Sequence, residues 1–194
     1  PLFTARQVDI TQKPLPTLIS SAYEIVSGGW EASDVFAYLR SGLAGLTSGE
    51  CDELENYCFT WSIDARRWHS ERGWGMHPDG YRSEFDDAAR ARLERVNELR
   101  RRASEPLLAF ERESAAAHTA REHCRALAAL FERLELARRL AERADGLERS
   151  GRRQAAAEYA RIWDAAVDAL EQCSAVLGDM DMDTQTFGRS YLLT

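Results

Sequence analysis

The sequence predicts an all-α fold, an irregular single domain of about eight or nine helices that spans residues 1–194. Three observations support this prediction. Apolar residues recur at spacings of three and four along most of the chain, as they do in helices that bury one face. Capping residues precede these stretches, and glycines follow them. No segment carries the alternating pattern that is typical of paired strands.

The N-terminal part is expected to begin with an extended stretch over residues 1–16, because two prolines close it. Thr17 is the expected N-cap of the first helix, and the glycine pair 28–29 ends that helix. Ser33 and Ser48 are the expected caps of the second and third helices. The inward faces of these two helices are predicted to include Val35, Phe36, Leu39, Leu54, Tyr57, Cys58 and Trp61.

A long irregular loop is predicted over residues 62–85, which hold three glycines, one proline and two tryptophans. Loops of this length inside a domain are usually functional or mobile. The side chains that interleave positive charge with aromatic rings there are Arg66, Arg67, Trp68, Arg72 and Trp74. Three interpretations stay open: the tryptophans anchor the loop to the core, the loop contacts a protein partner, or it grips DNA by phosphate contact and base stacking.

The rest of the chain is predicted to be helical. One helix covers residues 86–102, and Pro106 lies near the start of the next one. Thr119 and Glu122 form a capping box for a helix that runs to about Leu136.

Three more helices follow in the sequence pattern. Two of them cover residues 137–149 and 152–177, with a glycine after each. Thr184 is the expected cap of a last short helix. The arginine run 100–102 is interpreted as a solvated helix end, where positive charge suits the helix dipole.

Composition and charge exclude several classes of function. The formal net charge of −7 argues against non-specific adhesion to nucleic acid. Lys13 is the only lysine, so the G-x-x-x-x-G-K-[ST] loop that binds ATP phosphates is not present. The four cysteines form no C-x-x-C pair and are expected to be buried thiols in a reducing cytoplasm. The chain has no run of about 18 apolar residues that would predict a membrane span.

Neither a metal site nor a catalytic residue is expected. The acids that alternate over residues 179–183 lack the glycine and glutamate of a calcium loop, so they are interpreted as a solvated capping loop. His118, His123 and Cys124 have no fourth ligand in view, and the last two point apart on a helix. The serine motif G-x-S-x-G is missing. The chain is therefore predicted not to be an enzyme and to hold no cofactor of its own.

Several motifs along the chain together match one family pattern. Positions that match W-x-x-x-D-V-F-x-Y-L-[KR]-[ST]-G-L are Trp30, Asp34, Val35, Phe36, Tyr38, Leu39, Arg40, Ser41, Gly42 and Leu43. A D-x-L-E-N-Y motif follows at Asp52, Leu54, Glu55, Asn56 and Tyr57. Later matches include Asn97, Arg100, Pro106 and Leu107, and an A-x-E-Y-x-x-[IL]-W motif whose last residue is Trp163. Through these motifs the sequence resembles AddB-type proteins over nearly its whole length. It departs from them at Ser62 and Ala65, where the family's G-I-x-G-x-x-W loop has glycines.

AddB is one subunit of the AddAB helicase–nuclease, which resects double-strand DNA ends for recombinational repair, and it is similar to UvrD-like superfamily 1 helicases. The resemblance implies that this chain is a fragment that follows helicase motif IV, like the helical 2B-type insertion of such helicases. It implies a non-catalytic accessory domain whose partners are an AddA-type motor and nuclease subunit and double-stranded DNA ends, with no membrane. ATP, Mg²⁺ and the 4Fe–4S cluster would belong to other parts of the parent.

The resemblance also implies structural roles for the motif residues. Those expected to support the fold are Trp30, Phe36, Tyr38, Leu54, Glu55, Asn56, Tyr57 and Trp163. Among them, Leu54 and Tyr57 are expected to pack inward, while Glu55 and Asn56 bond a neighbouring segment. Two alternatives stay open: a stand-alone helical scaffold or protein-interaction domain unrelated to DNA repair, and a small helical enzyme.

Overall fold

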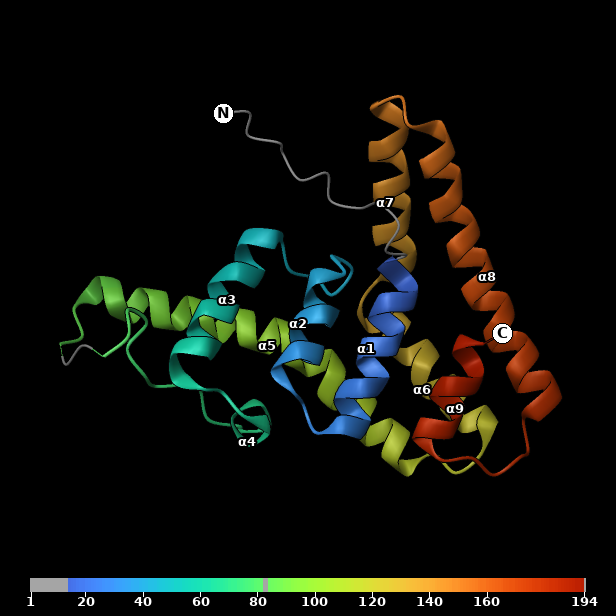
Figure 1. Ribbon diagram of the computed structural model, residues 1–194, viewed down its shortest axis with the longest axis horizontal. Helices are drawn as coiled ribbons and strands as arrows, with labels where there is room; N and C mark the ends of the chain where they lie inside the picture. The colour runs from blue at the N-terminus through green and yellow to red at the C-terminus, as the bar shows by residue number, and fades with distance from the viewer. Residues whose placement is uncertain (1–13, 82–83, 194) are drawn as a thin grey trace, which may run out of the picture.

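The computed structural model describes residues 14–81 and 84–193. Within these ranges the chain forms nine helices, and no strand beyond an isolated bridge between Thr119 and Asp181 (Figure 1). The helices are α1 (Pro14–Gly28), α2 (Ala32–Arg40), α3 (Ser48–Trp61), α4 (Ala65–Trp68), α5 (Asp87–Ala116), α6 (Ala120–Arg133), α7 (Leu136–Arg149), α8 (Arg153–Leu177) and α9 (Thr184–Leu192). The predicted all-α fold is therefore confirmed. None of these described helices is long and apolar enough to cross a membrane.

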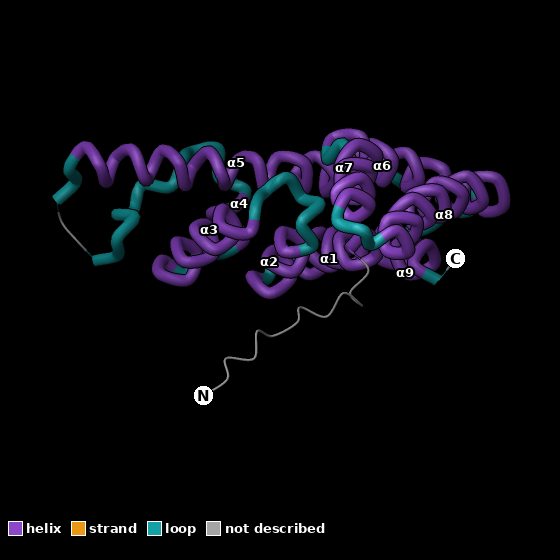
Figure 2. Tube along the Cα trace, turned by 90° about the horizontal axis from the view of Figure 1, so that it is seen from above, coloured by secondary structure: helices purple, strands orange, loops and turns teal. Residues whose placement is uncertain are grey.

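Helix α5, of 30 residues, runs along much of the molecule and packs against α1, α3 and α6 (Figure 1). With a rise of about 1.5 Å per residue, a helix of this size is about 45 Å long. Seen from above, α5, α6 and α7 lie along one side and α3, α2, α1 and α9 along the other, so the body is flattened into two layers (Figure 2). Helices α7 and α8 form a hairpin at the end opposite to the 62–85 loop (Figure 1).

Helix α1 begins earlier than the sequence pattern predicts. Pro14 and Pro16 lie in its first turn rather than in an extended segment, and Thr17 lies inside the helix instead of capping it. Prolines fit a first turn because the amide hydrogens there have no intrahelical partner. Residues 1–13, the rest of the predicted extended stretch, lie outside the described residues. The helix ends as predicted, and Gly29 follows it with a φ of +86°.

Three predicted caps lie one or two residues too far along the chain. The residues that prove to be inside their helices are Ser33, Ser48 and Thr184. Thr47 caps α3, because its side chain accepts the amide of Glu50 and the Glu50 carboxylate accepts the amide of Thr47. Asp183 caps α9 by accepting the amide of Thr186. In both helices the residue just upstream reaches the third amide of the helix, which is the geometry of a good cap.

Helix α5 continues through Pro106, whereas the sequence pattern predicts a break before this residue. A proline inside a helix removes one backbone hydrogen bond, here to the carbonyl of Arg102. The helix continues because its buried stripe crosses this position without interruption. The stripe consists of Val96, Leu99, Ala103, Leu107 and Phe110. Tertiary packing thus outweighs the local signal of the proline.

The boundaries of the later helices follow the sequence closely. The capping box of Thr119 and Glu122 is present at the start of α6. That helix ends at Arg133, slightly before the predicted Leu136, because Glu135 takes a left-handed conformation with a φ of +50°. Helices α7 and α8 match their predicted ranges to within one residue. Local capping and hydrophobic spacing therefore define this half of the chain well.

The motif residues contribute much of the core. The buried ones are Trp30, Phe36, Tyr38, Leu54 and Tyr57. The sequence pattern predicts inward packing for three of them, Phe36, Leu54 and Tyr57. Trp163 is half-buried, with its ring centre 6.0 Å from that of Phe131. Glu55 pairs with Arg40 of α2 and so bonds a neighbouring segment as predicted. Asn56 was predicted to do the same but is exposed instead. The face of α3 that carries Leu54, Tyr57 and Cys58 is buried, and Asn56 lies on the opposite face of the helix.

Candidate interface in the 62–85 loop

The 62–85 loop is partly ordered by its own side chains. It begins at Ser62, the C-cap of α3, which takes a left-handed φ of +46°. This is the position at which the AddB-like pattern has a glycine. The short helix α4 follows, and the Asp64 carboxylate caps it by accepting the amide of Arg67 at 3.1 Å. The predicted irregular loop therefore contains one helical turn.

The two tryptophans of the loop lie in the core. Trp68 is 2% exposed and Trp74 is 5% exposed. Their ring centres are 5.0 Å apart with the rings nearly perpendicular, an arrangement that aromatic pairs favour. Trp74 also stacks in parallel on Tyr57 at 5.4 Å, and Trp30 lies 6.0 Å from Trp68. These two residues therefore anchor the loop, and their buried rings do not offer a surface for stacking bases.

Two side chains of α5 fasten the loop backbone. The Asn97 amide bonds Trp74 twice, accepting from its backbone N–H at 2.7 Å and donating to its carbonyl at 2.9 Å. The Arg100 guanidinium donates to the carbonyl of Ser70 at 2.9 Å and lies 5.6 Å from the centre of the Trp74 ring. Burial lowers the pKa of Arg100. Both residues match the family pattern in the sequence, but sequence reasoning missed this role.

The arginine run 100–102 is accordingly not a solvated helix end. Arg100 is buried in the middle of α5. Arg101 pairs with Glu98, and Arg102 donates to Glu50 at 2.8 Å and to the carbonyl of Gly45 at 2.6 Å. The prediction of a helix end is wrong because the helix does not stop before Pro106. Only the first of the three side chains is shielded from water, since Arg101 and Arg102 are exposed.

Hydrogen bonds from aromatic side chains complete the attachment of the loop. Tyr57 donates its hydroxyl to the carbonyl of Met76 at 2.9 Å, and Trp61 donates its indole N–H to that of His77 at 3.0 Å. The imidazole of His77 is buried and lies between the amide of Asp79 and the carbonyl of Glu84. These contacts satisfy polar backbone groups that an irregular segment would otherwise leave buried without partners.

Three arginines remain on the outside of the loop. Arg66, Arg67 and Arg72 are exposed. Arg67 donates to the carbonyl of Trp61 at 2.8 Å, so its guanidinium is held in place. In the part of the chain that the structure describes, the ion pairs next to the loop are His69 with Glu111 and Arg92 with Asp79. None of them engages these three arginines, which therefore present positive charge on a rigid base.

Two exposed aromatic residues lie beside these arginines in the sequence and were missed by sequence reasoning. Phe59 is 70% exposed on α3, and Tyr81 is 89% exposed at the far end of the loop. The Tyr81 ring lies 4.8 Å from that of Trp61. Phe59 could have been found from its place on the polar face of its helix. Solvent-facing rings of this kind can stack on bases or pack against a protein partner.

Hydrogen bonds to one carboxylate of α5 also join the loop to the segment between α1 and α2. Glu111 of α5 accepts from the Trp30 indole at 3.0 Å and bonds the His69 imidazole at 2.7 Å. The other ring nitrogen of His69 lies 2.7 Å from the carbonyl of Ala65. Burial by itself would lower the pKa of His69, but its bonds to Ala65 and Glu111 outweigh that effect and raise it. No local sequence signal predicts these bonds, because Glu111 is 42 residues away from His69.

The residues considered as metal ligands have other partners. No group of three or more His, Cys, Asp or Glu side chains that could hold a metal ion occurs in ranges 14–81 and 84–193. Asp179 lies 3.4 Å from Arg121. His123 is buried beside Phe187 and 3.0 Å from the carbonyl of Met182, and all four cysteines are buried.

Comparison with known proteins identifies relatives of a much larger size, although no family model matches. The chain is 34% identical to the AddB subunit of the ATP-dependent helicase/deoxyribonuclease from Desulforudis audaxviator, over 97% of this chain and 17% of that protein. It is 30% identical to the protein of the same name from Acetivibrio thermocellus, with the same coverage. The Ruminiclostridium cellulolyticum protein is 29% identical over 97% of this chain. The chain thus spans about 17% of the length of the curated relatives that it matches, and the AddB resemblance is confirmed.

Proposed function

Since the chain matches a segment of the AddB subunit of ATP-dependent helicase/deoxyribonucleases, we propose that it serves as a non-catalytic accessory region of such a protein. The observation that carries the proposal is this match along almost the whole chain. In this role the region packs on the helicase-like core or on an AddA-type motor subunit, and it takes part in the processing of double-strand DNA ends in the cytoplasm. ATP, Mg²⁺ and a 4Fe–4S cluster are then held by other parts of the parent protein.

The 62–85 loop is the surface that suits DNA in this proposal. Arg66, Arg67 and Arg72 are exposed, and guanidinium groups bind phosphate oxygens in a bidentate manner. Tyr81 adds an exposed aromatic ring on which a base can stack. Because the loop is anchored by Trp68 and its neighbours, binding does not have to order it first. A contact of this kind positions the duplex without reading its sequence.

The proposal predicts salt-sensitive binding of the chain to a tailed DNA duplex, measured by fluorescence anisotropy. Replacing Arg66 and Arg72 together by Gln should weaken binding and make the slope of log K against log salt less negative by about 1–2. The matched control replaces Arg112 and Arg189, exposed arginines on α5 and α9, so that the same charge is lost elsewhere.

Two results would contradict this assignment. If the control pair weakens binding as much as the loop pair, the effect is one of net charge and not of the loop. If the chain binds no duplex at low salt and is not captured by the motor subunit either, the accessory role itself fails. Capture by the motor subunit without DNA binding would retain the accessory role and exclude the loop as a DNA contact.

A further inference from the structure

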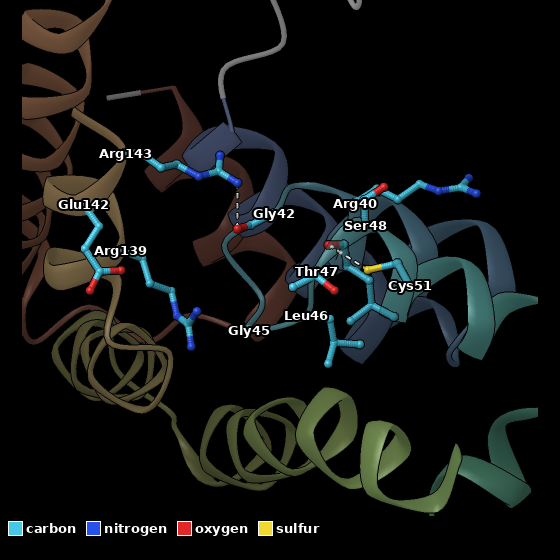
Figure 3. Close-up of a pocket in the computed structure, with 11 residues that line it drawn as sticks. Arg40, Gly42, Gly45, Leu46, Thr47, Ser48, Cys51, Arg139, Glu142 and Arg143 are labelled. Carbon is cyan, nitrogen blue, oxygen red and sulfur yellow. Dashed lines mark hydrogen bonds between the residues drawn. The ribbon is translucent and has the colours of Figure 1, made fainter. Parts of the chain in front are cut away.

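A cavity of about 670 Å³ lies between α7 and the segment that joins α2 to α3 (Figure 3). Its walls include apolar side chains from the α2–α3 side, among them Leu39 and Leu46. Arg139 and Arg143 extend into it from α7, and Ser48 lines it at the first turn of α3 (Figure 3). The cavity is separate from the 62–85 loop, since none of its lining residues belongs to that segment.

Two glycines make room for the guanidinium groups. Gly42 has a φ of +71° and Gly45 a φ of +89°. A side chain at Gly42 would collide with the guanidinium of Arg143, and one at Gly45 would meet that of Arg139 at 3.4 Å. Arg143 donates to the Gly42 carbonyl at 2.8 Å (Figure 3). Both arginines are thus held against a turn that lacks side chains, with part of each guanidinium turned to the cavity.

The charges of these two arginines are balanced by carbonyl groups rather than by dedicated carboxylates. Arg143 bonds the carbonyls of Ser41 and Gly42, and Arg139 bonds that of Leu134 at 2.7 Å. They lie four residues apart on one helix, a spacing at which like charges repel. An anion bound in the cavity would relieve this repulsion.

The carboxylates around the cavity are engaged elsewhere. Glu142 accepts from Arg138 at 2.6 Å. Glu135 also pairs with Arg138, and its carboxylate oxygen lies 4.0 Å from the guanidinium of Arg139, which is too far for a hydrogen bond. The third arginine of the lining, Arg40, points away from the cavity (Figure 3) and pairs with Glu55. The positive charges of Arg139 and Arg143 are therefore not neutralised by a close ion pair with a neighbouring carboxylate.

We propose that this cavity binds a phosphate group. Two planar guanidinium groups provide bidentate donors for phosphate oxygens. Ser48, in the first turn of α3, lines the cavity and supplies its hydroxyl and its backbone amide as further donors. The volume exceeds that of one phosphate, so an attached sugar can enter as well. If the chain acts as proposed above, the phosphate is a phosphodiester of the DNA backbone; only this identity rests on the proposed function.

The test compares melting temperatures of the chain in inorganic phosphate and in chloride at equal ionic strength. A site that binds phosphate should raise the melting temperature by about 2–4 °C at about five times the dissociation constant. Ser48→Glu places a carboxylate in the cavity at a helix start, where an acid is favourable. It should keep the fold and abolish the phosphate response. Arg139→Gln should reduce the response. The control Arg149→Gln, at an exposed position in the last turn of α7 and outside the cavity lining, should retain it.

Equal melting in phosphate and chloride for the unchanged chain would overturn the proposal, and so would a full phosphate response in Ser48→Glu. Binding of a tailed duplex by the same variant distinguishes the source of the phosphate. Weaker DNA binding with a lost phosphate response assigns the cavity to the DNA backbone. Unchanged DNA binding with a lost response upholds the site and assigns it to a free phosphate-bearing ligand. Failure of the Arg66 and Arg72 test leaves these outcomes unaffected, so the two proposals fail separately.

Discussion

The 62–85 loop and the α7–α8 hairpin are attached to the rest of the molecule in opposite ways. The loop has little regular structure, yet Trp68, Trp74 and His77 are buried and α5 fastens its backbone. The hairpin is regular over helices of 14 and 25 residues, but its buried side chains are only Leu136, Leu140, Ala156, Leu170 and Cys173. Firm attachment therefore depends on buried side chains and satisfied polar groups, and not on how regular the backbone is.

The largest effect that separates the two regions is expected from Trp74→Ala in the loop. The ring is buried among Tyr57 and Trp68, so its loss should lower the free energy of unfolding by about 3–5 kcal/mol. Trp163→Ala in the hairpin should cost less than half as much, because that side chain is only half-buried. Urea denaturation of both variants measures the difference. Equal losses would mean that the hairpin is held as firmly as the loop.

A smaller loss is expected from Asn97→Ala, which removes the two bonds to the backbone of Trp74. Leaving these groups unsatisfied should cost about 1–3 kcal/mol of unfolding free energy. Asn56→Ala is the matched control, since its side chain is exposed and its loss should stay within about 0.5 kcal/mol. Chemical denaturation gives both values. A similar cost at the two sites would show that Asn97 does not fasten the loop.

A gain of stability is expected where the loop begins. Ser62 has a φ of +46°, a region that glycine adopts without steric cost. Ser62→Gly should therefore raise the free energy of unfolding by about 0.5–1 kcal/mol. Ser41→Gly tests the argument at the C-cap of α2, where φ is −55° and no strain is relieved. If both variants gain equally in thermal melts, the left-handed conformation of Ser62 is not the cause.

The smallest effect concerns pH and the hydrogen bond between His69 and Glu111. The folded state raises the pKa of His69 through its bonds to Ala65 and Glu111. The stability from this pair is then fully present below the unfolded pKa of about 6.5 and is lost as pH rises through the folded pKa. His69→Gln should accordingly lower the melting temperature more at pH 5.5 than at pH 8.5. A difference that grows toward high pH would contradict the proposed charge state. The pair is partly exposed, so solvent reduces its contribution.

Helix content and most helix boundaries could be predicted because they depend on neighbours in sequence. The capping box of Thr119 and Glu122 is complete within four residues, and the inward face of α3 follows from helical spacing. The exposure of Asn56 was available from the same periodicity. Pro106 shows the limit, since α5 passes through it only because residues on either side share one buried stripe.

The candidate interface was harder to predict because its structure depends on contacts between distant segments. Sequence composition identified the arginines and tryptophans of the loop but could not separate those that anchor from those that face solvent. That division is made by Asn97 and Arg100, which lie 23 and 30 residues from their backbone partners. The cavity proposed to bind phosphate depends on contacts between segments that are still further apart in the sequence. Arg143, for example, donates to the carbonyl of Gly42, 101 residues earlier.

Trp30 and the two tryptophans of the loop also give the protein an optical property. The ring centres of Trp30 and Trp68 are 6.0 Å apart, and those of Trp68 and Trp74 are 5.0 Å apart. Indole chromophores at such separations share excitation energy and couple their transition dipoles, so near-ultraviolet circular dichroism should carry a signal from this trio. Detachment of the loop would change that signal without any attached dye. The same tryptophan packing that holds the loop therefore provides an intrinsic spectroscopic signal of whether the loop is attached.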